Sequence, residues 1–271
     1  MSKMAVAATS NSKSKVVLAK PMVQSPSSGL PPSPSQLPSQ SEWDKALSLP
    51  MVDGDGEIHS FESLIQTDYE IDTVLVIFVR HFFCGLCKNY IESLSPLITP
   101  ETLKLQRTRL IIIGCGGYSM IKPYAEELRT PFPIYTDHSR AIFKALGMGR
   151  TLQGPAKKPA YVKTTVVEMG LKAFKHVMKS AMHGGALWDA GDMSQVGGEW
   201  FIRNGKLEWG HRMPDTAGHM SAEEIWDVVK FRSEEQGGTQ IREGIVRAGT
   251  MEKHGAFEPS RIEDTKRCGC S

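Results

Sequence analysis

Two cysteines stand three positions apart in the stretch FFCGLCKNY, where Cys84 and Cys87 follow an apolar run and precede a segment with helical periodicity. A cysteine in the first turn of a helix lies beside unpaired N–H groups and the positive end of the helix dipole, which stabilise its thiolate. A second cysteine three residues later lies on the same helix face and can attack a disulfide or sulfenic acid formed on the first. The spacing therefore predicts Cys84 as a nucleophile and Cys87 as a resolving thiol.

A buried structural couple and half of a zinc site are the two other interpretations of the pair, because free cysteines are often buried and thiolates bind zinc. A structural zinc site needs four ligands, and the other paired thiols, Cys268 and Cys270, stand far away near the C-terminal end. His183, His211 and His219 lack the i, i+4 spacing of helical metal ligands, and we expect them to form hydrogen bonds. The placement of the pair between a strand and a helix favours the redox interpretation.

Three basic residues flank the pair: Arg80 and His81 precede it, and Lys88 follows it. Positive charge close to a cysteine favours the thiolate over the thiol. We expect Arg80 to contribute most of this charge, and we predict Cys84, Cys87 and Arg80 as the catalytic residues. A surface salt bridge at the end of the strand is the alternative interpretation of Arg80.

The remaining cysteines have more than one interpretation each. Cys115 ends the apolar stretch RLIIIGC, which favours a core residue over a third redox centre. Cys268 is fourth from the C-terminal end in CGCS, the position that prenylation requires, although Gly and Cys replace the usual aliphatic residues. A lipid anchor at Cys268 would place the chain at a membrane. The alternative is an exposed thiol pair, Cys268 and Cys270, that meets the CxxC or a partner.

Strand and helix patterns alternate along the middle of the chain. We expect a turn, a short strand and a helix capped by Ser60 or Ser63, and then the following elements in order: a continuously apolar strand at 73–80, a helix from Cys84, a strand at 109–116, a helix at 119–129, a short strand at 132–137, a helix at 139–146, two antiparallel strands flanking Asn204-Gly205, and a capped helix at 221–232. This order predicts an α/β protein of thioredoxin-like fold, with a central mixed sheet flanked by helices. Residues 148–194 interrupt it as an insertion, helical at about 165–182, before the C-terminal hairpin.

Composition places this domain between two tails. Residues 1–41 contain no acidic residue and are rich in serine and proline, which predicts a disordered tail. Residues 42–233 form the predicted domain, and 234–271 are polar and predicted to be flexible. The lack of acids in the first tail is also a property of mitochondrial transit peptides, which leaves a mitochondrial location as the lesser alternative.

Charge and hydropathy exclude several classes of function. The net charge of +2 comes from 32 basic and 30 acidic residues, so nucleic acid or an anionic membrane is not expected as the main partner. Five cysteines are too few and too unevenly placed for a disulfide-stapled secreted fold. The longest apolar run, VLVIFV, is far below the roughly 20 residues that cross a bilayer. We therefore predict a cytoplasmic protein in a reducing compartment.

Four blocks of sequence, in order, carry a family resemblance: FVRHFFCGLCKNYIESL, IIIGCGGYSMIKPYAEEL, FPIYTDHSRAIFKALGMG and GDMSQVGGEWFIRNGKLEWGHRMPDTAGH. They resemble the signature blocks of the peroxiredoxin-like 2 family, which are AhpC/TSA-type antioxidant domains of thioredoxin fold. The resemblance implies a thiol-disulfide oxidoreductase, with Cys84 and Cys87 matching the CxxC of the family. It also implies no bound cofactor, a thioredoxin- or glutathione-type reductant or another NADPH-dependent system, and a small peroxide, a disulfide or a lipid endoperoxide as substrate.

Two departures from related patterns narrow the expected chemistry. A peroxiredoxin has PxxxTxxC before its peroxidatic cysteine, whereas the matching stretch here, FVRHFFC, contains neither proline nor threonine. This favours dithiol exchange, on an apolar substrate beside Phe82 and Phe83, over peroxide clearance. The segment at the cis-proline position of thioredoxins is Ser194-Gln195-Val196, and we expect Gln195 or Val196 to face the thiols in a trans peptide.

A non-catalytic binding module of thioredoxin fold is the alternative function. In this interpretation the two tails and the insertion bind a partner. The proline-rich LPPSP in the first tail would adopt an extended helix that SH3 or WW domains bind. Composition does not choose between enzyme and module.

Overall fold

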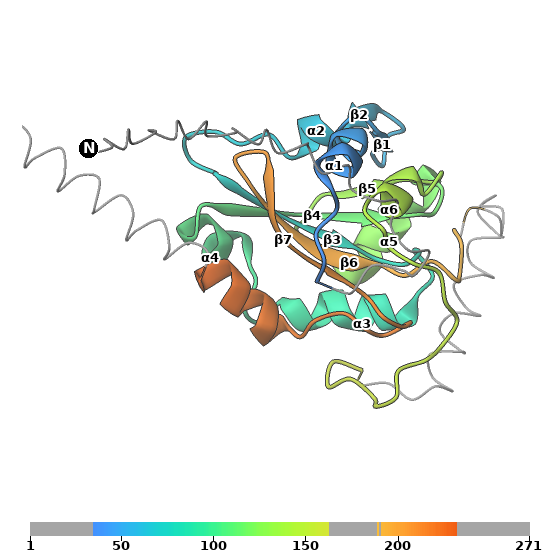
Figure 1. The fold of residues 1–271 in the computed structure, drawn as a ribbon. Coiled ribbons are helices and arrows are strands. Elements are labelled where there is room, and N and C mark those ends of the chain that lie inside the picture. The colour runs from blue at the N-terminus through green and yellow to red at the C-terminus, as the bar shows by residue number, and fades with distance from the viewer. Residues whose placement is uncertain (1–34, 163–188, 190, 232–271) are drawn as a thin grey trace, which may run out of the picture. The chain divides into compact units, whose positions relative to one another are not determined.

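The computed structural model describes residues 35–162, 189 and 191–231, so both predicted tails lie largely, and the predicted helix at 165–182 wholly, outside the described residues. Seven strands form one sheet in the order β2-β1-β5-β4-β3-β6-β7 (Figure 1). The strands are β1 (Pro50–Val52), β2 (Ile58–Ser60), β3 (Thr73–Phe78), β4 (Thr108–Gly114), β5 (Ile134–Thr136), β6 (Gly198–Arg203) and β7 (Lys206–Arg212). β3, β4 and β5 are parallel neighbours, whereas β6 and β7 are antiparallel.

Helices cover both faces of this sheet. They are α1 (Gln40–Leu47), α2 (Phe61–Leu64), α3 (Gly85–Leu94), α4 (Pro100–Leu105), the short 3-10 helix η1 (Tyr118–Met120), α5 (Ile121–Leu128), α6 (Ala141–Ala145) and a helix at residues 222–231. Side chains of α3, α5 and the 222–231 helix pack on one face, and those of α1, α2 and α6 pack on the other. Figure 1 shows α3 and the last helix together on one side of the sheet and α1 and α2 on the opposite side.

The predicted thioredoxin-like fold is confirmed by the strand order. β3 and β4 are parallel and joined through α3, and the β6–β7 hairpin adds to the other edge of β3. Every residue of β3 is buried because its side chains alternate between two covered faces, as a continuously apolar strand predicts. Asn204 and Gly205 at the hairpin turn have φ angles of 47° and 74°, the conformation that an Asn-Gly turn provides.

The sequence predicted two helix caps correctly but missed two short helices. Ser60 caps α2, as predicted, and Ser221 and Glu224 exchange the hydrogen bonds of a capping box before the last helix. The pattern did not predict α1 and α4. The first begins at Gln40, slightly before the predicted domain boundary, and the second buries little beyond Leu103. Helices this short produce weak periodicity, because their stability comes from packing and capping rather than from their own sequence.

Phe143→Ala tests the core on the α1–α2–α6 face, where the Phe143 ring is fully buried and contacts Phe78 edge-on at 5.0 Å. We expect this change to lower the free energy of unfolding by about 3–5 kcal/mol, because it removes buried apolar surface and leaves a cavity. Urea unfolding followed by circular dichroism measures the loss. Leu105→Ala is the matched control, since Leu105 is 82% exposed. Equal losses in the two variants would contradict this core assignment.

Candidate functional site

Cys84 lies where β3 leads into α3, as the sequence predicts. It is the N-cap residue of α3, and its sulfur accepts a hydrogen bond from the backbone N–H of Cys87 at 3.4 Å. The Cys84 carbonyl accepts from the Lys88 N–H at 3.0 Å, which begins the helix. Cys84 is only 4% exposed and Cys87 is completely buried, and both are free thiols. The sulfur of Cys84 therefore lies at the positive end of a helix and away from bulk water.

Arg80 points its guanidinium at this sulfur, with Nη1 of Arg80 lying 3.3 Å from Sγ of Cys84. The same guanidinium donates from Nε to the Gln195 carbonyl at 3.1 Å, from Nη1 to the Thr216 carbonyl at 3.4 Å, and from Nη2 to the Met193 carbonyl. Arg80 is only 6% exposed, so the surface salt bridge that was its alternative interpretation does not fit this position. The three predicted catalytic residues lie together.

The two thiols differ strongly in acidity. The hydrogen bond from the Cys87 side chain is the main cause that holds the pKa of Cys84 well below its ordinary value, with further help from His81, Arg80 and the Cys87 N–H, against the opposing effect of burial. Burial, followed by the contact with Cys84, raises the pKa of Cys87 well above its ordinary value. Cys84 is therefore the more acidic of the two thiols, which is the division that a nucleophile and a resolving group require.

Arg80 is the permanent positive charge near Cys84. Burial lowers the pKa of His81, so its ring is mainly neutral at pH 7, whereas a guanidinium keeps its proton. Lys88, the third basic neighbour, forms an ion pair with Glu127 and lies 5.7 Å from the centre of the Tyr124 ring. Arg80 is thus the neighbour that stays charged at neutral pH, and the expectation that it contributes most of the positive charge at Cys84 stays a prediction.

Two predicted neighbours of the thiols lie differently from expectation. Gln195 meets the site through its carbonyl on Arg80, while its side-chain Nε2 turns to the Gly149 carbonyl at 2.9 Å. Phe82, expected to line an apolar cleft, is 1% exposed and packs on Tyr124 at 5.0 Å between ring centres. It is a core residue because it fills the space above a glycine: a Cβ at Gly114 would come within 2.5 Å of its ring.

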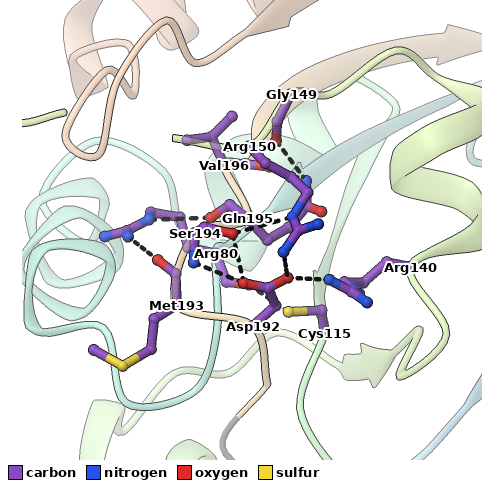
Figure 2. A network of polar contacts seen from close by, with 10 residues as sticks. All are labelled: Arg80, Cys115, Arg140, Gly149, Arg150, Asp192, Met193, Ser194, Gln195 and Val196. Carbon is purple, nitrogen blue, oxygen red and sulfur yellow. Dashed lines mark hydrogen bonds and ion pairs between the residues drawn. The ribbon is translucent and has the colours of Figure 1, made fainter. Parts of the chain in front are cut away.

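Cys115 occupies the core position that the sequence predicts, and it also contacts the site. Its thiol donates to the Arg80 carbonyl at 2.9 Å (Figure 2). Burial raises the pKa of Cys115 to about 11, so it stays a thiol at neutral pH. The contact joins the end of β4 to the residue that faces Cys84.

A buried polar cluster lies on the same sheet face as α3, and sequence reasoning missed its central residue. Glu199 of β6 is fully buried, with its two carboxylate oxygens 2.7 Å from His211 Nδ1 and 2.5 Å from His219 Nδ1. The His219 ring stacks on Tyr90 of α3, 4.0 Å away and nearly parallel. These contacts confirm the predicted hydrogen-bonding role of His211 and His219; His183 lies outside the described residues. The signal available in the sequence was a single acidic residue inside the otherwise apolar strand segment GEWFI.

The described ranges show neither a cluster of three or more His, Cys, Asp or Glu side chains suited to a metal ion nor a helix long and apolar enough to cross a bilayer. Cys268 and Cys270 lie outside those ranges.

Comparisons with known proteins show which families the chain is similar to. A family model described as AhpC/TSA antioxidant enzyme matches residues 93–215. Peroxiredoxin-like 2C of Mus musculus is 29% identical over 185 residues, covering 67% of this chain and 77% of the relative, and the Homo sapiens protein has the same values. Peroxiredoxin-like 2C of Takifugu rubripes is 32% identical over 143 residues, covering 51% and 60%. The chain is thus similar to peroxiredoxin-like 2 proteins over more than half of its length.

These matches confirm the resemblance seen in the sequence blocks and support antioxidant or thiol oxidoreductase chemistry in general. The region matched by the family model begins after the CxxC, so it leaves the roles of Cys84 and Cys87 to the geometry. Among solved structures, Xanthomonas campestris peroxiredoxin Q is 12% identical with a TM-score of 0.46, covering 73% of this chain and 96% of its own. A mutant of Arenicola marina peroxiredoxin 6 is 13% identical with a TM-score of 0.47, covering 72% of each chain.

Arg80→Gln tests the charge beside Cys84. We expect the pKa of Cys84 to rise, because the charged donor to its sulfur is lost, and alkylation of Cys84 by iodoacetamide below the inflection of its pH profile to slow about tenfold or more. Peptide mass spectrometry over a range of pH measures the rate at Cys84 alone. Arg107→Gln is the matched control, because Arg107 is half exposed and pairs with Asp72 at 2.9 Å. An unchanged profile in Arg80→Gln would contradict the assignment.

Glu199→Gln tests the buried polar cluster through the pH dependence of stability. Burial opposes ionisation of Glu199, but His219 and His211 outweigh it and hold its pKa at about 2, below the ordinary 4.5. A lowered pKa in the folded state stabilises the fold above pH 4.5, and this contribution is lost as pH falls toward 2. We expect the variant to lose up to about 1.4 kcal/mol per pH unit of that dependence, the effect of one proton.

Urea unfolding at a series of pH values between neutral and strongly acidic measures this slope. Glu208→Gln is the control, because Glu208 is a partly exposed carboxylate on β7 that pairs with Arg203 at 3.4 Å. A Glu199→Gln variant with the full acid dependence of the wild type would show that the carboxylate does not ionise with a low pKa in the folded state.

Proposed function

We propose that the chain is a thiol-dependent oxidoreductase that cycles between a Cys84–Cys87 dithiol and a disulfide. The contact of 3.3 Å between Nη1 of Arg80 and Sγ of Cys84 carries the proposal, since a buried guanidinium at this distance favours the thiolate. The raised pKa of Cys87 supports the second half of the cycle, because a thiol that stays protonated does not compete as nucleophile. The reductant is a thioredoxin- or glutathione-type thiol or another NADPH-dependent system, in a reducing compartment such as the cytoplasm.

With a disulfide substrate, the Cys84 thiolate attacks one sulfur, a mixed disulfide forms, and the other substrate sulfur leaves as a thiolate. Cys87 then gives up its proton to the departing thiolate and attacks Cys84. The Cys84–Cys87 bond forms as the mixed disulfide breaks. The protein loses two electrons and the Cys87 proton, and the substrate gains them; the substrate sulfur that left first takes its proton from water. An external dithiol reverses the change and becomes a disulfide itself.

With a peroxide, the Cys84 thiolate attacks one oxygen, the O–O bond breaks, and the leaving oxygen takes a proton to become an alcohol or water. The resulting sulfenic acid on Cys84 is attacked by Cys87, which releases water and forms the same disulfide. Both routes place the first chemical step on Cys84 and the second on Cys87. The disulfide route and the peroxide route differ only in the substrate that reaches the sulfur of Cys84.

The surroundings of Arg80 favour an apolar substrate for this cycle. The carbonyl of Met193 accepts a hydrogen bond from Arg80 (Figure 2). Met193 itself is 65% exposed, so it presents an apolar side chain to the solvent beside this site. Phe83, next to Cys84, is only partly buried against the core. The chain before Cys84 also supplies no hydroxyl side chain from Phe78 to Phe83 that would orient a small peroxide. An apolar disulfide, or a lipid endoperoxide in the narrower form of the proposal, fits these features better than hydrogen peroxide.

Oxidation in solution tests the cycle. We expect the wild type, treated with a stoichiometric disulfide or hydroperoxide under native conditions, to lose two hydrogen atoms in the peptide that holds both cysteines. Cys87→Ser is expected to stop at a mixed disulfide or a sulfenic acid on Cys84, which dimedone traps. Cys84→Ser is expected to lose turnover completely, because neither Cys87 nor Cys115, the other cysteines within the described ranges, is activated in the same way.

Cys115→Ser is the matched control, because Cys115 is a buried thiol near the site whose raised pKa keeps it unreactive, and it should form the Cys84–Cys87 disulfide at the wild-type rate. If Cys84 and Cys87 stay free under oxidant while circular dichroism shows an intact fold, the enzyme proposal fails and the binding-module alternative stands. Turnover that survives Cys84→Ser would also overturn the proposed mechanism.

A further inference from the structure

The loop before β6 holds Arg80 from one side. Two main-chain carbonyls of this loop, those of Met193 and Gln195, accept hydrogen bonds from the Arg80 guanidinium. Main-chain carbonyls hold the guanidinium of an arginine in one orientation only if the backbone that carries them is itself held in place. The direction in which Arg80 points therefore depends on what holds residues 192–196 in place.

Asp192 makes the largest set of polar contacts in this loop (Figure 2). Its Oδ2 forms ion pairs with Arg140 and, at 2.6 Å, with Arg150 Nη2. Its Oδ1 accepts from the backbone N–H of Ser194 at 2.8 Å and from the Ser194 hydroxyl at 2.6 Å. The carboxylate thus joins the helix α6 end, the segment after α6 and its own loop. Its side chain is 18% exposed, so these contacts are partly shielded from water.

The backbone on both sides of Met193 is fixed by the segment that carries Arg150. The Thr151 N–H donates to the Ser194 carbonyl at 2.7 Å, and the Val196 N–H donates to the Gly149 carbonyl at 3.2 Å. Arg150 Nε adds a hydrogen bond to the Ser194 hydroxyl at 3.1 Å. Asp192 lies at the start of this ladder, and its carboxylate pairs with both arginines.

We propose that Asp192 is a positioning residue: by holding the 192–196 loop to Arg140 and Arg150, it fixes the Met193 and Gln195 carbonyls that aim Arg80 at the Cys84 sulfur. The proposal rests on the proposed role of Arg80 and adds a residue that touches neither thiol. This positioning effect lowers the pKa of Cys84, whereas the negative charge of Asp192 by itself would raise it, because a nearby anion disfavours a thiolate. The positioning effect and the direct electrostatic effect therefore have opposite signs.

Asp192→Asn separates the two effects. If Asp192 positions Arg80, the inflection in the pH profile of Cys84 alkylation by iodoacetamide moves to higher pH, and the rate below the inflection falls about 3- to 10-fold. If only its charge matters, the inflection moves to lower pH. Mass spectrometry of the Cys84 peptide gives the rate. Asp55→Asn is the matched control, because Asp55 is 72% exposed and pairs with Lys122 away from the thiols.

Combining Asp192→Asn with Arg80→Gln tests the route. We expect no further shift to higher pH in the double variant, since the arginine that Asp192 positions is already gone. The inference would be overturned if Asp192→Asn caused the same shift in the wild type and in the Arg80→Gln variant. A shift to lower pH, or no shift, in Asp192→Asn alone would also overturn it. An unchanged profile in Arg80→Gln alone would overturn both this inference and the role of Arg80, whereas a changed Arg80→Gln beside an unchanged Asp192→Asn overturns this inference only.

Ser194→Ala provides a second variant that changes no charge. It removes the hydroxyl contacts to Asp192 and Arg150 and leaves both ionic side chains in place. We expect a shift of Cys84 alkylation in the same direction as Asp192→Asn and smaller than that shift. If Asp192→Asn does not fold, this variant decides the question, and a wild-type profile in Ser194→Ala would overturn the inference.

Discussion

A buried guanidinium beside a cysteine sulfur is the interaction on which the rest of the site depends. Arg80 keeps its charge wherever it lies, and burial of a charge is costly unless it is paired or fully hydrogen-bonded. Three main-chain carbonyls and the sulfur of Cys84 meet this requirement. The same burial that would raise the pKa of an isolated thiol here strengthens the interaction that lowers it, because the local dielectric constant is low. The low pKa of Cys84 therefore depends on the hydrogen bond from the Cys87 side chain and on the fold that brings Arg80 to the same sulfur.

The fold brings these groups together from distant parts of the chain. β3 ends just before Arg80, and α3 begins at Cys84, so the sheet and the helix fix the two ends of the contact. The acceptors of the guanidinium come from residues more than a hundred positions later, on either side of the β6–β7 hairpin. Cys115 adds a contact from the end of β4 to the Arg80 carbonyl. The site consequently forms only when the central strands are paired in the native order.

Local patterns predicted the parts of this site that are local. The apolar run at β3, the helix start at Cys84 and the Asn-Gly turn all follow from residue types within a few positions, and the cysteine spacing by itself indicates the two thiols. Arg80 could be named a candidate from its closeness in sequence, but its orientation could not, because its acceptors at Gln195 and Met193 are distant in sequence. Glu199 and Asp192 were missed for the same reason. An isolated acid in a strand or a loop becomes informative only when its partners are known.

Equilibrium redox titration of the Cys84–Cys87 pair tests the central claim most directly. The folded wild-type protein is equilibrated with glutathione or dithiothreitol buffers of known potential, quenched with acid, and the free and bonded forms are separated by mass. A pair that cycles in catalysis should titrate as one two-electron couple with a potential between about −120 and −270 mV, the range of known thiol-disulfide catalysts. Two thiols that stay reduced at every potential, or a disulfide whose potential lies below about −300 mV as in structural disulfides, would contradict the account.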